Sequence, residues 1–217
     1  MYHWGTGPAV LLVHGWHGRG AQLGAFVAPL VSAGYRVVAF DAPAHGRTPG
    51  HATSLPEVSE ALLTVANAFP PLHGVIGHSF GAVCTLNAIH HGLAPQRVVA
   101  ISAPASIDFL LDSFAAQLEI PATVMAVHRR LMEARFGADL WKQFSPTEIA
   151  RGLDIPALLV HDRDDHDVPW QEGEALVRAW PGTTWHLTQG LGHRRILREP
   201  EVVARVVAFM TEPSTHA

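Results

Sequence analysis

The sequence contains a single cysteine, Cys84, so no disulfide bond can form within the chain. This agrees with a reducing compartment, and we expect a cytoplasmic protein. The first ten residues, MYHWGTGPAV, contain neither a basic n-region nor a small-residue cleavage site, which argues against a secretory leader. The first apolar run, 8–13, is far too short to cross a bilayer. We therefore expect no membrane span.

Strong charge of either sign is also lacking. The chain carries 19 acidic and 15 basic residues, for a formal net charge of -4, and its basic residues cluster only in short pairs such as Arg129-Arg130. A balance this mild does not favour a nucleic-acid or membrane-surface partner. The 15 histidines are scattered along the chain rather than grouped at ligand spacing. We therefore expect no metal site.

Apolar residues make up 48% of the 217 residues, which suits one domain with a single core, expected to span 1–217. Short apolar runs rich in β-branched residues alternate with segments of helical periodicity. The expected strands are 9–13, 36–40, 74–77, 97–101, 157–161 and 184–187, and the expected helices lie at about 20–33, 56–68, 80–91, 171–179 and 200–211. Strands that are apolar throughout are typical of parallel sheets covered on both faces. The sequence thus predicts an α/β fold, with an open, mostly parallel sheet of about six strands and helices on both faces.

The stretch 103–152 interrupts this alternation, because it contains no recognisable strand. Two apolar patterns at helical spacing occur in it, separated by Pro121. Near its end, 145–148 (SPTE) reads as a capping box with proline at the first helical position. We expect a small helical cap inserted over the carboxyl edge of the sheet, where it would wall an apolar pocket. The alternative is a set of ordinary core helices beside the sheet.

The segment Gly77-His78-Ser79-Phe80-Gly81 follows an apolar strand and precedes a helical pattern. A serine on such a sharp strand-to-helix turn presents its hydroxyl at the carboxyl edge of the sheet, and the flanking glycines permit the turn. A chance glycine-rich turn is the alternative, but the context favours Ser79 as a candidate nucleophile.

A serine hydroxyl is a weak nucleophile without a base. The sequence Gly190-Leu191-Gly192-His193 follows the last expected strand and offers His193, although a plain surface histidine is the alternative. An acid is expected after the strand 157–161, where the next six residues contain four aspartates. One of them must orient the imidazole, while the others are expected to be solvated or to form turns. Spacing alone does not choose among them.

An oxyanion formed at Ser79 needs two preorganised N–H donors. One candidate is the backbone N–H of Phe80, the residue after the nucleophile. The second is the backbone N–H of Trp16, in the turn His14-Gly15-Trp16-His17-Gly18 that follows the first expected strand. We expect His14 and His17 to have a structural role at the strand end rather than to bind metal.

Taken together, these segments resemble the α/β-hydrolase superfamily of esterases and lipases over the whole chain. Five landmarks fall in the family's order: HGWHG at 14–18, DAPAHGRT at 41–48, GHSFG at 77–81, the segment 161–169 that resembles HG-x-x-D-x-x-VP, and GLGH at 190–193. Counting back from Val168-Pro169, the resemblance implies that the acid is Asp165, with Asp164 as the second choice. It also implies that Trp16 and Phe80 form the oxyanion hole.

The resemblance implies a carboxylic ester hydrolase without a cofactor, acting on a small-molecule ester through an acyl-enzyme. The single-residue turn HGW resembles that of members that mostly handle small to medium acyl chains. The alternatives are a thioesterase, amidase, perhydrolase or carbon–carbon hydrolase, and a non-catalytic ligand-binding member of the fold. Candidate pocket walls, each of which could instead be cap core, are Phe109, Phe114, Met125, Leu131, Met132, Phe136 and Trp141.

The chain departs from the family pattern in three places. Asp162 stands where the family usually has glycine, and Ala44 replaces the glycine before His45-Gly46; neither belongs to the expected triad. In addition, only residues 1–7 precede the first expected strand, where the family usually has an antiparallel pair. We therefore expect a shortened N-terminus with 36–40 near the sheet edge. Because an exposed apolar edge invites pairing, we expect it to be covered by a homodimer contact or by the N-terminal segment.

Overall fold

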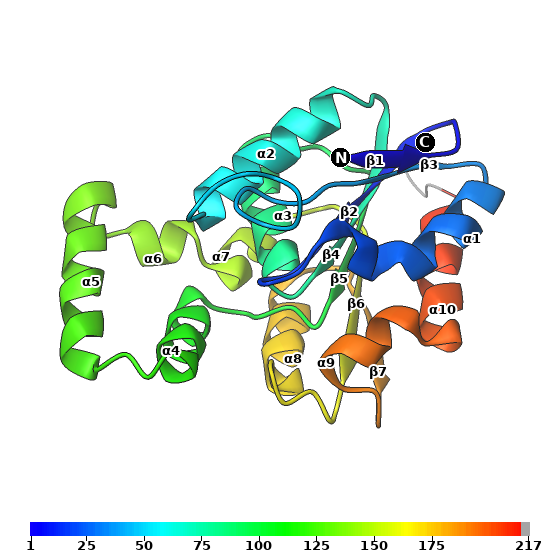
Figure 1. The fold of residues 1–217 in the computed structure, drawn as a ribbon. Coiled ribbons are helices and arrows are strands. Elements are labelled where there is room, and N and C mark those ends of the chain that lie inside the picture. Colours follow the sequence, from blue (N-terminus) through cyan, green and yellow to red (C-terminus); the bar gives the residue numbers. More distant parts are fainter. Residues whose placement is uncertain (214–217) are drawn as a thin grey trace.

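The computed structural model describes residues 1–213 and has a seven-stranded sheet at its centre (Figure 1). The strand order is β1-β3-β2-β4-β5-β6-β7; only β1 is antiparallel to its neighbour. The strands are β1 (Tyr2–Trp4), β2 (Ala9–Val13), β3 (Arg36–Ala39), β4 (Leu72–His78), β5 (Arg97–Ile101), β6 (Ala157–Asp162) and β7 (Thr184–Thr188). The predicted open, mostly parallel α/β sheet is confirmed. The expected number of strands was one too low, because β1 is short and exposed and has no apolar pattern.

β1 lies along the outer side of β3, with Tyr2 opposite Ala39 and Trp4 opposite Val37. Without it, β3 would be the edge strand, and its Val37 and Val38 side chains are fully buried. Of the two ways expected to cover this edge, the structure therefore shows the N-terminal segment. The backbone N–H and C=O groups of β1 pair with those of β3, which an apolar edge strand would otherwise offer to another chain.

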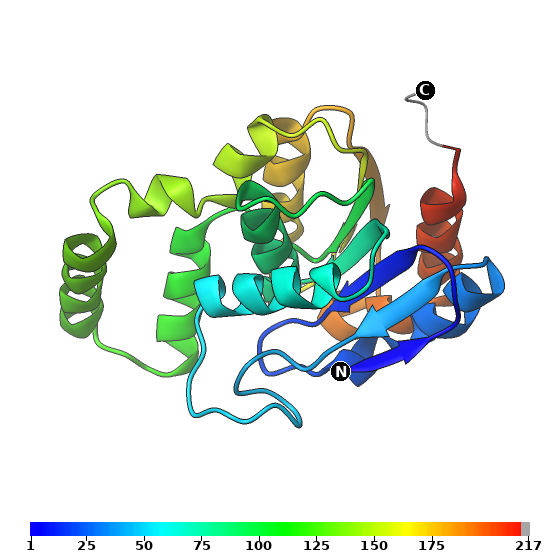
Figure 2. The same cartoon turned by 90° about the horizontal axis from the view of Figure 1, so that it is seen from above.

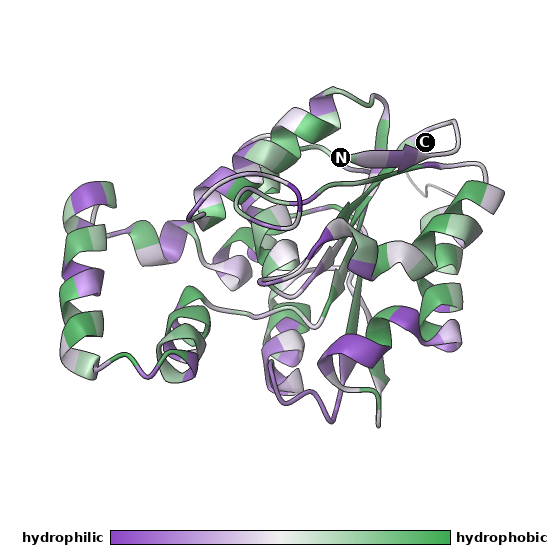
Figure 3. Cartoon of the chain, in the orientation of Figure 1, coloured by the Kyte–Doolittle hydropathy of each residue, from purple (hydrophilic) through white to green (hydrophobic). Residues whose placement is uncertain are grey.

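Helices cover both faces of the sheet (Figure 2). Alternating residues of one strand enter two cores: Leu11 and Val13 pack on one face, and Val10 and Leu12 pack on the other. Because both faces are covered, the central strands are mostly hydrophobic (Figure 3). The first face is covered by α2 (Leu55–Asn67), α3 (Phe80–His90) and α8 (Trp170–Ala179), and the second by η1 (Gly20–Phe26), α1 (Val27–Ser32), η2 (Ile196–Arg198) and α10 (Pro200–Thr211).

Four helices lie between β5 and β6 in sequence: α4 (Ile107–Gln117), α5 (Ala122–Phe136), α6 (Leu140–Gln143) and α7 (Pro146–Arg151). α4 and α5 contain no buried residue and project away from the sheet (Figures 1 and 2). By contrast, α7 packs against α3 and α8 and contributes Ile149 and Ala150 to the core. None of the helices in residues 1–213 is long and apolar enough to span a membrane.

The prediction of a capping box at 145–148 is wrong in part. Pro146 is the first residue of α7, but the Ser145 side chain makes no capping hydrogen bond and lies 3.1 Å from the Thr147 hydroxyl instead. A serine cap forms at α2, where Ser54 accepts a hydrogen bond from the Glu57 N–H. The same S-x-x-E spacing thus gives a serine cap at α2 and none at α7, so the sequence pattern alone does not decide whether the cap forms.

The close approach of α3 to β2 depends on Gly81. A Cβ atom on this residue would lie 2.4 Å from the backbone oxygens of both Val13 and His14. We predict that Gly81→Ala lowers the free energy of unfolding by about 1–3 kcal/mol or more, because rigid backbone must move. Gly24→Ala is the control, since nothing lies within 4 Å of its added Cβ. Urea unfolding of both variants tests this, and equal stability would contradict it.

Candidate active site

Ser79 occupies the turn between β4 and α3 in a strained conformation, with φ 54° and ψ −124°. Its N–H donates to the Ile101 carbonyl at 2.8 Å, and its carbonyl accepts from the Ala82 N–H at 2.9 Å. Both flanking glycines are needed for packing, since a Cβ on Gly77 would lie 2.7 Å from the Ala82 Cα. The strained turn is therefore held by the sheet on one side and by the helix on the other.

His193 and Asp165 are joined by a hydrogen bond of 2.8 Å between Nδ1 and Oδ2. The other carboxylate oxygen of Asp165 accepts the N–H groups of Asp167 at 3.0 Å and Val168 at 2.9 Å. Burial would raise the pKa of Asp165, but the hydrogen bond and charge of His193, with the Val168 N–H, hold this pKa below its ordinary value. An ionised carboxylate can only accept. Nδ1 therefore carries the hydrogen and Nε2 keeps its lone pair.

The four neighbouring aspartates have different surroundings, which spacing could not reveal. Only Asp165 bonds to His193; Asp164 accepts the Gly190 N–H at 2.9 Å, and Asp167 lies 3.6 Å from Arg194. This geometry supports Asp165 over Asp164 as the acid. The remaining aspartates are predicted to be solvated or to form turns. Asp162 does form a turn, since its Oδ1 accepts the Asp164 N–H at 2.9 Å, but it is not solvated, because it is 0% exposed.

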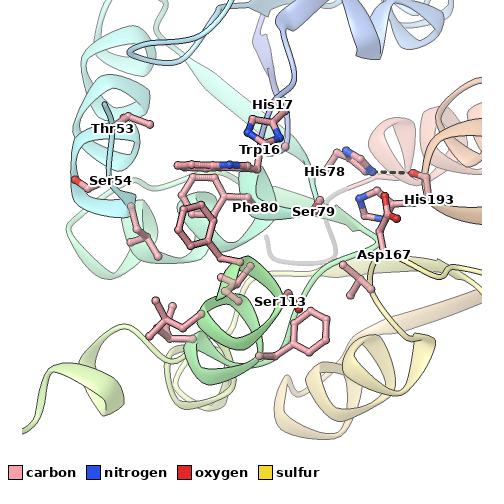
Figure 4. A pocket seen from close by; sticks show the side chains of 18 of the residues that line it. Trp16, His17, Thr53, Ser54, His78, Ser79, Phe80, Ser113, Asp167 and His193 are labelled. Atoms are coloured by element: carbon pink, nitrogen blue, oxygen red, sulfur yellow. Dashed lines mark hydrogen bonds between the residues drawn. The ribbon is translucent and has the colours of Figure 1, made fainter. Parts of the chain in front are cut away.

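His78 is a buried neighbour of His193 to which the sequence motifs assign no role. Its Nε2–H donates to the His193 carbonyl at 2.9 Å, and the two rings lie 4.6 Å apart (Figure 4). Burial, and then the positive charge that His193 can carry, lower the pKa of His78 to about 3. His78 therefore stays neutral and fixes the backbone of His193. Its place directly before Ser79 was the one available signal.

His14 has the structural role expected of it. Its Nε2 accepts the Ala42 N–H at 2.9 Å, so its Nδ1 carries the hydrogen and donates to the Gly15 carbonyl at 2.8 Å. These bonds fix the turn after β2 against the loop after β3. A Cβ on Gly15 would lie 3.0 Å from the Ser79 Cβ, so glycine lets this turn approach the candidate nucleophile.

Trp16 and Phe80 face each other edge to face beside Ser79, with ring centroids 5.1 Å apart (Figure 4). Phe80 is the first residue of α3, so its own helix offers no acceptor for its N–H. Among the turn and loop hydrogen bonds of residues 1–213, the Trp16 N–H has no acceptor. Both N–H groups are thus available as donors, as the oxyanion-hole hypothesis requires.

Ser79, His193 and Trp16 line one cavity of about 940 Å³. Most expected pocket walls line it as well: Phe109, Phe114, Met132, Phe136 and Trp141. Met125 and Leu131 are not part of the lining, and Leu131 is 65% exposed, so the expectation for these two is wrong. Within residues 1–213, no cluster of three His, Cys, Asp or Glu side chains could hold a metal ion.

Residues 10–206 match the model of the Alpha/beta hydrolase family. The chain is 39% identical over 100 residues to a pimeloyl-[acyl-carrier protein] methyl ester esterase of Methylococcus capsulatus, a match covering 45% of this chain and 37% of that protein. It is 26% identical to the protein of the same name from Aromatoleum aromaticum, over 92% of this chain and 96% of the relative. The first match therefore spans little more than a third of its relative.

Solved structures show the same fold. A bromoperoxidase from Bacillus anthracis superposes with a TM-score of 0.76 at 19% identity, covering 97% of this chain and 94% of that one. A monoacylglycerol lipase from Paleococcus ferrophilus superposes with a TM-score of 0.74 at 21% identity, covering 97% of both chains. At such identities the likeness establishes architecture and leaves the reaction to be argued from the site.

The hydrogen bond to His193 predicts different effects for two adjacent aspartates. Asp165→Asn removes the acceptor that fixes the Nδ1–H tautomer, so any reaction that uses His193 as a base should slow by about 10³–10⁴-fold. Asp164→Asn, the matched control, alters only an exposed bond to Gly190 and should cost far less. Steady-state kinetics of both variants decide between them, and a larger loss in Asp164→Asn would contradict the assignment.

The buried His78 predicts an acid-side loss of stability. The ordinary pKa of 6.5 is lowered to about 3 in the folded protein, so between these values only the unfolded chain binds the proton. The free energy of unfolding should therefore fall as pH drops below about 6.5, by up to about 1.4 kcal/mol per pH unit from this group. His78→Gln should flatten this dependence, measured by urea unfolding at several pH values. If the free energy of unfolding of His78→Gln depends on pH as steeply as that of wild type and of the exposed control His51→Gln, the prediction is contradicted.

Proposed function

The chain belongs to the alpha/beta hydrolase family, and we propose that it is a carboxylic ester hydrolase working through a covalent acyl-enzyme at Ser79. The observation that carries this proposal is the 2.8 Å bond between Asp165 and His193, beside a cavity that Ser79 also lines. The bond leaves Nε2 of His193 as the basic atom. A nucleophile, a base and an orienting acid thus meet at one cavity.

In the proposed first step, the Ser79 oxygen attacks the ester carbonyl while Nε2 of His193 takes the hydroxyl proton. The carbonyl oxygen becomes an oxyanion that accepts the backbone N–H groups of Trp16 and Phe80. The carbon–oxygen ester bond then breaks, and the alcohol leaves with the proton from His193. Water, deprotonated by the same imidazole, releases the acid and restores Ser79.

The proposed substrate is an ester with an apolar acyl chain of small to medium length. Aromatic and aliphatic side chains of α4, α5 and α6 line the cavity, including Phe109, Met132 and Trp141. These helices serve as a cap over the carboxyl edge of the sheet within a single-domain enzyme. Two relatives are named as methyl ester esterases, which supports an ester of a small alcohol.

Replacing the nucleophile tests the proposal directly. Ser79→Ala should lose at least about 10⁴-fold in turnover of a nitrophenyl ester, together with the burst of nitrophenol from acylation. A fluorophosphonate probe should label wild type at Ser79 and leave the variant unlabelled. Turnover or labelling that survives in Ser79→Ala would refute the assignment.

The thioesterase, amidase and ligand-binding alternatives are resolved in the same assay series. Esters of graded acyl length, with the thioester and amide of the preferred acyl group, show which bond is cleaved fastest. Preference for the thioester or amide would reassign the reaction while keeping the nucleophile. Absence of labelling in wild-type protein would favour a ligand-binding member of the fold.

A further inference from the structure

We propose that Asp162 is a positioning residue for the base, holding the loop that carries His193 against the turn that carries Asp165. The inference rests on the proposed function, because it concerns the alignment of the same site. Asp162 is the last residue of β6 and touches neither the cavity nor the imidazole. It stands where α/β-hydrolases usually have glycine, so its carboxylate adds bonds that glycine cannot make.

The Asp162 carboxylate is 0% exposed and accepts four hydrogen bonds. Oδ1 accepts the N–H groups of Gly192 at 2.9 Å and Asp164 at 2.9 Å. Oδ2 accepts the Thr188 hydroxyl at 2.7 Å and the Leu191 N–H at 3.1 Å. Hydrogen bonds to an ionised carboxylate are stronger than those between neutral groups. Each oxygen thus holds two donors, and the buried charge is compensated.

The loop before His193 needs such an anchor. Gly190 and Gly192 both have positive φ, 84° and 66°, a conformation that glycine adopts without favouring it over others. The helix that follows, α9 (Gly192–Arg195), has only four residues and no side-chain cap from its preceding residue. Left alone, this segment would sample several conformations. Asp162 fixes the consecutive N–H groups of Leu191 and Gly192, and Gly192 directly precedes His193 in the sequence.

The same carboxylate also fixes the acid. Its bond to the Asp164 N–H lies one residue before Asp165, and the adjacent Arg163 N–H donates to the Thr188 carbonyl at 2.9 Å. One buried group therefore connects the turn of the acid with the loop of the base. The 2.8 Å contact between Asp165 and His193 depends on both segments keeping their relative position. A displacement of about 1 Å in such a site can cost about 10²-fold in rate.

The test compares Asp162→Asn and Thr188→Val with wild type. In Asp162→Asn, an amide N–H₂ replaces one carboxylate oxygen and so faces N–H or hydroxyl donors. Thr188→Val removes only the Thr188 hydroxyl donor and keeps the carboxylate. We expect turnover per folded molecule to fall about 10–100-fold in Asp162→Asn and less in Thr188→Val. KM should change far less than kcat, because neither residue lines the cavity. Labelling of Ser79 by a fluorophosphonate should slow in parallel with kcat.

Ser59→Ala is the structural control, since Ser59 is 2% exposed and bonds to Asn87 and Cys84 on α3. It should lower the midpoint of thermal unfolding without a matching loss of kcat per folded molecule. Should Asp162→Asn fail to fold, Thr188→Val carries the test. Full kcat per folded molecule in the variants that fold, with Ser79→Ala inactive, overturns the positioning role alone. Activity in Ser79→Ala overturns the proposed function instead.

Discussion

The candidate site depends on one constraint, that parallel strands deliver their carboxyl ends to a single edge of the sheet. Trp16 follows β2, Ser79 follows β4, Asp165 follows β6 and His193 follows β7. The strand order, however, puts β5 between β4 and β6. Because His193 follows β7, its loop must reach past the ends of β6 and β5 to meet β4, where His78 contacts it. Ser102, small and fully buried, follows β5 at this point.

A base that reaches across the sheet needs support from more than one element. The imidazole is held at Nδ1 by Asp165, the His193 carbonyl by His78, and the preceding loop by Asp162. The pKa shifts of the groups around His193 agree with these supporting roles. Burial lowers the pKa of His78 and of His161, while hydrogen bonds outweigh burial and lower the pKa of both aspartates. The loop that carries His193 thus lies among ionised carboxylates and neutral imidazoles.

Local signals predicted most of the framework, since runs of β-branched residues and paired glycines act within a few residues of one another. Such signals predict Ser79 and His193 as the nucleophile and the base, whereas Asp165 is predicted through a resemblance rather than through spacing. The burial of Asp162 could not be predicted, because an aspartate after a strand is equally compatible with water. Its partners in 188–192 are distant in sequence, and only the paired strands bring them close. The prediction that Leu131 lines the cavity is wrong for a related reason. Helical spacing does not tell which side of a projecting helix faces the cavity.

The proposed site has two parts, the sheet edge and the helices α4 and α5, and the sheet edge is the more firmly held. The sheet edge is fixed by buried hydrogen bonds to Asp162 and Asp165, whereas α4 and α5 have no buried residue. α5 is tied to α4 through the pairing of Arg129 with Asp108 and Asp112, and exposed pairs of this kind contribute little to stability. Apolar side chains around the cavity would be buried further by the apolar acyl chain of the proposed substrate. Under the proposed function, substrate selection would rest on α4 and α5, whereas the chemistry would rest on the sheet edge that carries Ser79 and His193.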